Sequence, residues 1–267
     1  MFADLALAAR IESAEASLTA AVVRAMPDAG AQLIEIAGGV AAWARAGSPM
    51  NKAIGFGFRG PVGGRDVEVI AGVFRSVGEP ARLELSTLVD PSILTAFTSR
   101  GFALQSFEHV LGLPLQGIEG GTGEIVVERV APAESRDWGE VAVEGFLHPD
   151  GTGTGEEEFP RQALETVMHD FARAPAMRGY VARIDGVAAG AASCHFSDGL
   201  AQLCGAATLP AFRRRGVQRA LLAARLADAR AAGCDLAVVT TAPGSQSQAN
   251  VQRQGFTLLY ARAILGT

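Results

Sequence analysis

The sequence contains the segment Ala206-Ala207-Thr208-Leu209-Pro210-Ala211-Phe212-Arg213-Arg214-Arg215-Gly216-Val217-Gln218. It continues an apolar run that begins at Leu200 and precedes a long amphipathic segment, Arg219 to Ala232. This order predicts a strand, a basic turn and a helix whose first backbone amides open onto the turn.

The basic turn has three consecutive arginines, Arg213 to Arg215, at the point where the helix begins. Cations there oppose the positive end of the helix dipole, which favours negative charge. Free amides, a glycine (Gly216) that permits close backbone approach, and guanidinium groups together favour a phosphate or pyrophosphate ligand. A solvated surface run is the simpler interpretation, and a nucleic-acid patch is a third.

The overall charge separates these interpretations. The chain has 23 Lys+Arg against 28 Asp+Glu, a net charge of −5 and a pI near 5.5. An acidic protein with one basic turn suits a discrete small anion better than a nucleic acid. The phosphate loop of nucleotide hydrolases is absent, because the sequence contains no Gly-Lys-Ser/Thr.

Composition indicates a compact protein. With 267 residues, 49% hydrophobic and 19% charged, the chain can bury one large core or two smaller ones. The three cysteines, Cys194, Cys204 and Cys234, have no CxxC spacing, so we expect neither a disulfide framework nor a metal site. No uncharged apolar stretch approaches the ~20 residues that span a bilayer. We therefore expect a cytoplasmic protein without a membrane partner.

The C-terminal half, residues 124–267, follows a glycine-rich segment, 117–123, that we interpret as a linker. Its order is β-α-α-β-β-β-α-β-α-β, which predicts an α/β fold with a mixed sheet. The predicted strands are Glu124–Val130, Gly179–Ile184, Val187–Phe196, Leu200–Thr208, Asp235–Thr241 and Phe256–Leu265, and the helices are Ser135–Phe146, Glu157–Arg173, Val217–Ala232 and Gln246–Gln254.

The N-terminal half, residues 1–116, contains a fainter copy of the latter part of this pattern. Arg100-Gly101-Phe102 parallels Gln254-Gly255-Phe256 at a helix-to-strand junction in both halves. We predict two related domains, with an unrelated α/β domain as the alternative. The predicted elements of this half are the strands Ala53–Phe58, Arg82–Thr87 and Phe102–Leu111 and the helices Asp66–Val77 and Ser92–Ser99.

Residues 124–265 resemble the GNAT superfamily of acyl-CoA-dependent N-acetyltransferases. The family pattern Arg/Gln-x-x-Gly-x-Gly/Ala follows a strand; Arg213 and Gly216 match it, and Gln218 replaces the usual small residue. A second match is Ser247-Gln248-Ala249-Asn250 followed by Arg253-Gln254-Gly255-Phe256, where the family places its last helix and strand. In the N-terminal half, Gly60-Pro61-Val62-Gly63-Gly64-Arg65 lacks the arginine cluster, so this copy is degenerate and is expected to bind no CoA.

The resemblance implies acetyl-CoA as co-substrate. Its pyrophosphate would bind the basic turn, and its pantetheine arm would pair with the main chain of the preceding strand. Asn250 matches a position that often contacts the pantetheine side, although a helix-surface role is the alternative. The implied cofactor-binding residues are Ala206, Ala207, Thr208, Arg213, Arg214, Arg215, Gly216, Val217, Gln218, Arg219 and Asn250.

The residues that would move protons depart from the family pattern. In the family a tyrosine commonly acts as the acid, at the position that Val251 occupies here. Tyr260, in the final predicted strand, is the nearest substitute, or else a core aromatic residue with a wet hydroxyl.

For the base, Gln202 occupies a place where a carboxylate would serve, and it cannot take a proton. His148 and His195 remain as candidates. We predict His148, because it lies in a region that lines the acceptor site in the family.

The resulting prediction is an N-acetyltransferase that transfers the acetyl group of acetyl-CoA directly to the amine of a small molecule. The alternative is a non-catalytic acyl-CoA-binding sensor or interaction protein. The sequence leaves both a monomer and a homodimer open.

Overall fold

A computed structural model describes residues 2–26, 30–117, 125–149 and 160–267. Most of the predicted linker, residues 118–123, lies outside these ranges, as does Glu124. The chain forms two compact units. Unit 1 comprises Met1–Leu111, Thr240–Pro243 and Thr257–Thr267, and unit 2 comprises Gly112–Val239 and Gly244–Phe256. The final strand therefore belongs to unit 1, whereas the sequence-based division groups it with the C-terminal half.

Unit 1 has the strand order β1-β2-β3-β4-β11-β5. The neighbours β1, β2 and β3 are antiparallel, β3 and β4 are parallel, and β11 is antiparallel to β4. The elements are α1 (Leu5–Ala25), β1 (Gln32–Ile36), β2 (Gly39–Trp43), β3 (Lys52–Ile54), α2 (Gly64–Arg75), β4 (Arg82–Ser86), α3 (Pro91–Thr98), β5 (Ala103–Pro114, whose last residues belong to unit 2) and β11 (Thr257–Gly266).

Helix α1 covers one face of this sheet. Asp4 caps it by accepting a hydrogen bond from the Leu7 amide at 2.8 Å. On its buried side Ala16 and Ala20 pack against Val40 and Ile54. Small alanines let the helix approach the strands closely, but they also weaken the apolar contrast from which sequence reasoning detects a helix. Helix α1 and strands β1 and β2 are therefore not among the elements predicted from the sequence.

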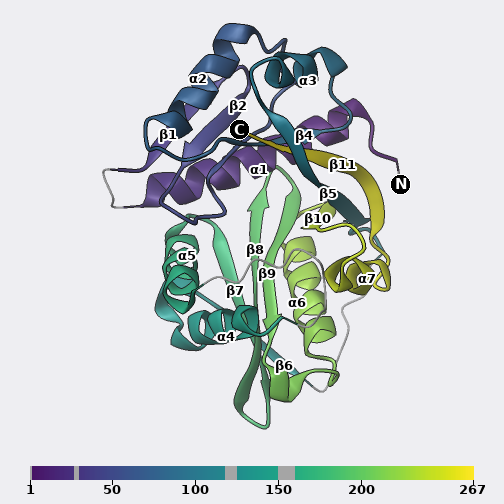
Figure 1. The fold of residues 1–267 in the computed structure, drawn as a ribbon. Coiled ribbons are helices and arrows are strands. Elements are labelled where there is room, and N and C mark those ends of the chain that lie inside the picture. Colours follow the sequence, from purple (N-terminus) through teal and green to yellow (C-terminus); the bar gives the residue numbers. More distant parts are fainter. Residues whose placement is uncertain (1, 27–29, 118–124, 150–159) are drawn as a thin grey trace. The chain divides into compact units, whose positions relative to one another are not determined.

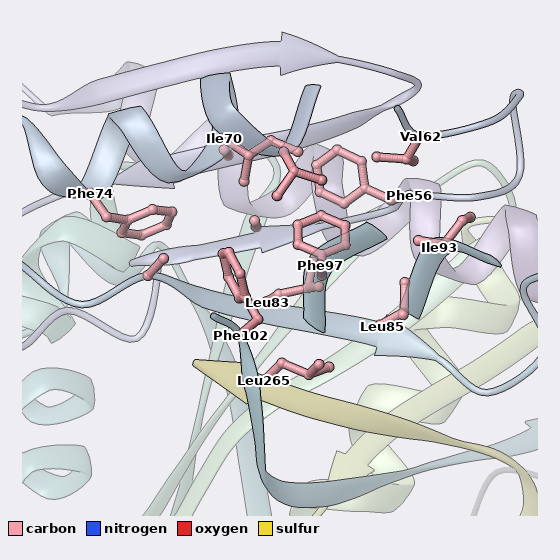
Figure 2. Close-up of a cluster of buried hydrophobic side chains, with 14 of the residues drawn as sticks. Phe56, Val62, Ile70, Phe74, Leu83, Leu85, Ile93, Phe97, Phe102 and Leu265 are labelled. Atoms are coloured by element: carbon pink, nitrogen blue, oxygen red, sulfur yellow. The ribbon is translucent and has the colours of Figure 1, made fainter. Parts of the chain in front are cut away.

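Helices α2 and α3 cover the opposite face, since Ala41 and Ala53 alternate with the residues under α1. Figure 2 shows the aromatic rings that fill this layer. The ring of Phe97 meets that of Phe102 edge-on, with centroids 5.1 Å apart, and tilts against Phe56 at 6.3 Å. Such edge and tilted contacts add to the stabilisation from burial alone.

Unit 2 has the strand order β10-β9-β8-β7-β6, antiparallel except for the parallel pair β9 and β10. Its elements are β6 (Val126–Val130), a short 3-10 helix (Pro132–Glu134), α4 (Arg136–Leu147), α5 (Arg161–Arg173), β7 (Met177–Ile184), β8 (Val187–Ser197), β9 (Leu200–Thr208), a 3-10 turn (Pro210–Phe212), α6 (Val217–Ala231), β10 (Leu236–Thr241, whose last residues belong to unit 1) and α7 (Gln246–Gln252).

The helices of unit 2 lie on both faces of its strands (Figure 1). Helices α4 and α5 bury Trp138 and Met168 against Val181 and Ala191. Helix α6 packs on the other face so closely that a Cβ on Gly190 of β8 would collide with Val217. The predicted C-terminal elements are thus present, with helix and strand ends shifted by a few residues.

The two halves repeat one motif. In each half a strand, a glycine-containing turn and a helix lead to a parallel neighbouring strand: Ala53 of β3 pairs with Leu83 of β4, and Leu200 of β9 pairs with Leu236 of β10. The right-handed β-α-β connection is the usual way to join such parallel neighbours.

The junction after the last helix also repeats. Gly101 and Gly255 both have positive φ, 91° and 92°, just past the ends of α3 and α7. The following residues, Phe102 and Phe256, each donate a backbone hydrogen bond into the last helical turn and are both 3% exposed. Glycine is required here because the left-handed conformation disfavours a side chain.

The final strands do not repeat in the same way. β11 pairs with β4 in unit 1, with Ile264 opposite Glu84. The end of β5 lies beside β10 in unit 2, where the Leu115 amide donates to the Asp235 carbonyl at 2.8 Å. Each half therefore supplies its last strand to a neighbour that the sequence order does not predict.

Candidate functional site

The site begins at an open edge of β9. The parallel pairing of β9 with β10 covers only Leu200–Gln202 against Leu236–Val238. For Leu203–Thr208 the described part of the chain provides pairing with β8 alone. This segment therefore presents main-chain N–H and C=O groups that an extended ligand can pair with.

A bulge interrupts this edge. Ser193 of β8 pairs with Cys204, and Ala192 pairs with Ala206, so Gly205 is the extra residue. Gly205 is exposed and has φ 46°, a conformation that suits glycine. Beyond the bulge, the small side chains of Ala206 and Ala207 permit close approach to the backbone.

The basic turn follows directly. Arg214 and Gly216 have positive φ, 62° and 87°, and Gly216 is the residue before the first turn of α6. Within the described residues, no side chain caps α6 and its first turn has no acidic residue. The first amides of the helix and the exposed guanidinium groups of Arg214 and Arg215 thus form a cationic site at its N-terminus.

Two side chains fasten this turn. Gln218 donates from Nε2 to the hydroxyl of Thr208 at 3.1 Å, which ties α6 to the end of β9. Arg213 donates from Nε to the Thr208 carbonyl at 3.4 Å and from Nη2 to the carbonyl of His148. The structure therefore brings His148 next to the basic turn through its main chain.

His148 ends helix α4, and its Nε2 lies 3.1 Å from Oε1 of Glu144. The other carboxylate oxygen of Glu144 accepts from Arg161 of α5. The hydrogen bond from Arg161 holds the pKa of Glu144 below its usual range, although the carboxylate is in contact with solvent. An ionised Glu144 fixes the ring nitrogen that bears the proton, which leaves Nδ1 of His148 as the basic atom.

The remaining predicted residues of unit 2 lie in α7 and in the strands. Asn250 accepts at Oδ1 from Gln246 Nε2 at 2.8 Å and from Arg253, so its amide is engaged within α7. Val251 is in the same short helix. Gln202 is buried and its Oε1 lies 3.0 Å from Nδ1 of His195, which gives each of these polar groups a partner.

Tyr260 lies in unit 1, on β11, and is 5% exposed. Its hydroxyl donates to Oε1 of Glu12 at 2.7 Å, and Arg262 Nε donates to the same oxygen at 2.8 Å. Burial, together with the charge of Glu12, raises the pKa of Tyr260 well above its usual value. The hydroxyl therefore keeps its proton and helps to satisfy a buried carboxylate.

Sequence reasoning missed two residues that shape the site. A Cβ on Gly145 of α4 would collide with the Cβ of Ala207, so this glycine lets α4 lie against the open strand. Arg225 of α6 is 5% exposed and donates from Nη1 to the Ser193 carbonyl at 3.3 Å. Two signals were available in the sequence: Gly145 lies inside one predicted helix, and Arg225 places a charge on the apolar face of another.

No helix in the described residues combines the length and apolar character needed to cross a membrane. Chemically, the site offers a strand edge for an extended ligand, a bulge at the exposed residue Gly205, and a cationic helix N-terminus for the phosphates of the ligand.

Comparisons with known proteins agree with this architecture. The solved structures that match include a GCN5-related N-acetyltransferase from Kribbella flavida (21% identity, TM-score 0.67, covering 97% of this chain and 95% of that one). They also include a tandem GNAT protein from the clavulanic acid biosynthesis pathway (12%, TM-score 0.60, 98% and 94%) and a GCN5-related N-acetyltransferase from Sphaerobacter thermophilus (13%, TM-score 0.57, 89% and 75%).

These likenesses establish the fold across nearly the whole chain. A comparison with curated proteins gives no match. The family model described as the acetyltransferase (GNAT) family matches residues 143–256, a range that contains β9, the basic turn, α6 and α7. The chain is therefore similar to the GNAT family over residues 143–256.

Proposed function

We propose that the protein is an acyl-CoA-dependent N-acetyltransferase that transfers the acetyl group of acetyl-CoA directly to the amine of a small molecule. The observation that carries this proposal is the open edge of β9, Leu203–Thr208, running into an uncapped, cationic helix N-terminus. The family implies acetyl transfer from acetyl-CoA.

The residues present fit acetyl-CoA. The small side chains of Ala206 and Ala207, with Thr208, would hold the pantetheine arm through main-chain groups. The amides of Val217 and Gln218 and the cations of the turn would hold the pyrophosphate. The remaining groups assigned to the cofactor are Arg213, Arg214, Arg215, Gly216, Arg219 and Asn250. Bound there, acetyl-CoA supplies the acetyl group as a thioester.

The protein's own groups would do three things in transfer. Amides at the bulge around Gly205 would polarise the thioester carbonyl by donating hydrogen bonds to it. The exposed Nδ1 of His148, oriented by Glu144, would accept the proton of the attacking amine. Tyr260 as the acid for the leaving thiolate stays a prediction, and its bond to Glu12 makes it the weaker of the two assignments.

Residues 1–116 are proposed to be the degenerate copy that binds no CoA. Helix α2, the counterpart of α6, begins after Gly63, whose amide donates to the carboxylate of Asp66 at 2.8 Å. That carboxylate already occupies the helix N-terminus, and its charge opposes a phosphate there. Helix α6 has no such acid in its first turn.

The first experiment is a thermal-shift titration with acetyl-CoA, because a ligand that binds only the native state raises the melting temperature. An unchanged melting temperature at saturating acetyl-CoA would contradict both the enzyme and the sensor alternative. Thiol release with a panel of small amines then separates them, since a sensor binds without turnover. His148→Ala leaves the main-chain contact to Arg213 in place, so a loss of turnover in this variant with unchanged CoA binding would support the base assignment.

A further inference from the structure

The cation that sequence reasoning missed, Arg225, lies inside unit 2 and is 5% exposed. It donates from Nε to the Leu221 carbonyl of its own helix at 3.2 Å and from Nη1 to the Ser193 carbonyl of β8 at 3.3 Å. Among the described residues, no carboxylate pairs with it. Burying a cation without a counter-ion costs free energy. The main-chain groups to which Arg225 donates should therefore explain why an arginine is present at this position.

Arg225 donates a hydrogen bond to β8, the strand that pairs with the bulged segment of β9. The register between β8 and β9 breaks at the step from Ala192 to Ser193, opposite Gly205. A bulge disrupts the local ladder and leaves main-chain groups in need of other partners. The guanidinium of Arg225 supplies a donor to the Ser193 carbonyl at that step.

The position of Arg225 on α6 complements that of Gln218. The two residues are about two turns, or roughly 10 Å, apart along the helix. Gln218 bonds to Thr208, and Arg225 bonds opposite Gly205; these two residues of β9 are likewise separated by roughly 10 Å of strand. Helix α6 therefore bonds to Thr208 at the end of β9 and to Ser193 of β8 beside the bulge, at two points along the segment that would carry the pantetheine arm.

We infer that Arg225 is a positioning residue for acyl transfer, which fixes the bulge at Gly205 so that the main-chain amides of the bulge meet the thioester carbonyl of the acyl group. This inference rests on the proposed function. It predicts that Arg225 affects ligands that carry the thioester carbonyl and spares ligands that lack it. A residue with a merely structural role would affect acetyl-CoA and CoA alike.

The test compares the Kd values of acetyl-CoA and CoA by calorimetry. One neutral hydrogen bond to the carbonyl predicts that the wild-type protein binds acetyl-CoA about two- to ten-fold more tightly than CoA. We expect Arg225→Met to lose this preference while its Kd for CoA stays within about two-fold of the wild-type value. Arg230→Met, on the exposed side of the same helix, is the matched control and should keep the preference.

Three results would overturn the inference. A wild-type protein without the preference has no carbonyl contact to position, although its binding of both ligands would leave the proposed function intact. An Arg225→Met protein that keeps the preference shows that Arg225 has only a structural role. A wild-type protein that binds neither ligand contradicts the proposed function itself.

Two further measurements cover the case in which Arg225→Met does not fold. Arg225→Gln replaces the guanidinium by a shorter, neutral side chain and should lose the same preference. In the wild-type protein, the Nη–H resonances of Arg225, which include the donor to Ser193, should shift more with acetyl-CoA than with CoA. Equal shifts with both ligands would contradict the inference without any variant.

Discussion

The side-chain amide of Gln218 donates a hydrogen bond to the hydroxyl of Thr208 over 3.1 Å, and this bond joins the first turn of α6 to the end of β9. The last position of the family pattern, which Gln218 occupies here, is usually glycine or alanine, and neither has a side chain that could make this bond. In this chain the bond fixes the helix N-terminus relative to the strand edge, so the phosphate and pantetheine parts of one ligand would be held in register.

Replacing Gln218 tests this link. Gln218→Ala should weaken CoA binding about three- to ten-fold, the effect of one neutral hydrogen bond on positioning. Gln218→Glu keeps the length and accepts from Thr208, but it places a negative charge beside the expected pyrophosphate. The CoA affinity of Gln218→Glu should fall by more than ten-fold. This loss should become smaller as salt is added, because salt screens the repulsion between the two negative charges. Calorimetric titration with CoA measures both, and unchanged affinity in both variants would contradict the assignment.

Arg214 is expected to be strained, because its φ of 62° is left-handed. Arg214→Gly should remove a conformational strain of about 1–2 kcal/mol from the folded protein. It should also raise the conformational entropy of the unfolded chain, which lowers the free energy of unfolding by roughly 0.4–1 kcal/mol. Arg215→Gly, the matched control, has only the second effect, because Arg215 is not among the residues with positive φ. Urea unfolding should find Arg214→Gly more stable than Arg215→Gly by about 1 kcal/mol, and both should bind CoA more weakly. Equal or reversed stabilities would show that the turn stores no strain.

Tyr260→Phe removes the hydroxyl that donates to Glu12 and leaves a buried carboxylate with one donor fewer. We expect the free energy of unfolding to fall by about 1–3 kcal/mol, as for other buried groups that lose a partner. If Tyr260 is also the general acid, turnover per folded molecule should fall by about 100-fold or more. Unchanged turnover would remove Tyr260 from the mechanism and leave its stabilising role.

Asp228 anchors α6 to the sheet, with Tyr180 donating to Oδ2 at 2.6 Å and Arg178 donating to the same atom at 3.0 Å. Burial alone would raise its pKa, but these hydrogen bonds outweigh burial and lower the pKa below the ordinary 3.8. The unfolded chain therefore binds the proton first, so the stabilisation is present above the ordinary pKa and is lost as the pH falls through the lowered one.

Asp228→Asn should therefore destabilise the protein most near neutral pH, by about 1.5–3 kcal/mol for hydrogen bonds to a charged group. The difference from the wild-type protein should shrink below about pH 4. Unfolding curves at several pH values measure it. A difference that stays constant with pH would mean that the charge of Asp228 contributes nothing.

Local sequence predicted most of unit 2 because its signals are short-range. The apolar run of β9, the basic turn and the stripe of α6 each lie within about 15 residues, the range over which periodicity and turn chemistry act. The repeat of the glycine junction at Gly101 and Gly255 is likewise readable, since only a left-handed residue fits there. The alanine-rich α1 carried too little apolar contrast to be detected.

The side-chain partners of the site could not be predicted in the same way. Tyr260 alternates correctly in its strand, but nothing near it in the sequence indicates that Glu12 accepts a hydrogen bond from its hydroxyl. Arg225 reads as a charge on an amphipathic helix, and only the bulge at Gly205 explains its burial. Such partners depend on which strands become neighbours.

The sequence by itself determined a GNAT-like strand, basic turn and helix, since these depend on local backbone preferences and on the charge of Arg213 to Arg215. Three features follow only from the tertiary structure: β11 pairs with β4, Tyr260 donates to Glu12, and α6 bonds to Thr208 of β9 and Ser193 of β8 through Gln218 and Arg225. The physical reason is that strand pairing and buried polar contacts are settled by the packing of the whole chain, because every buried donor and acceptor must find a partner wherever the fold places one.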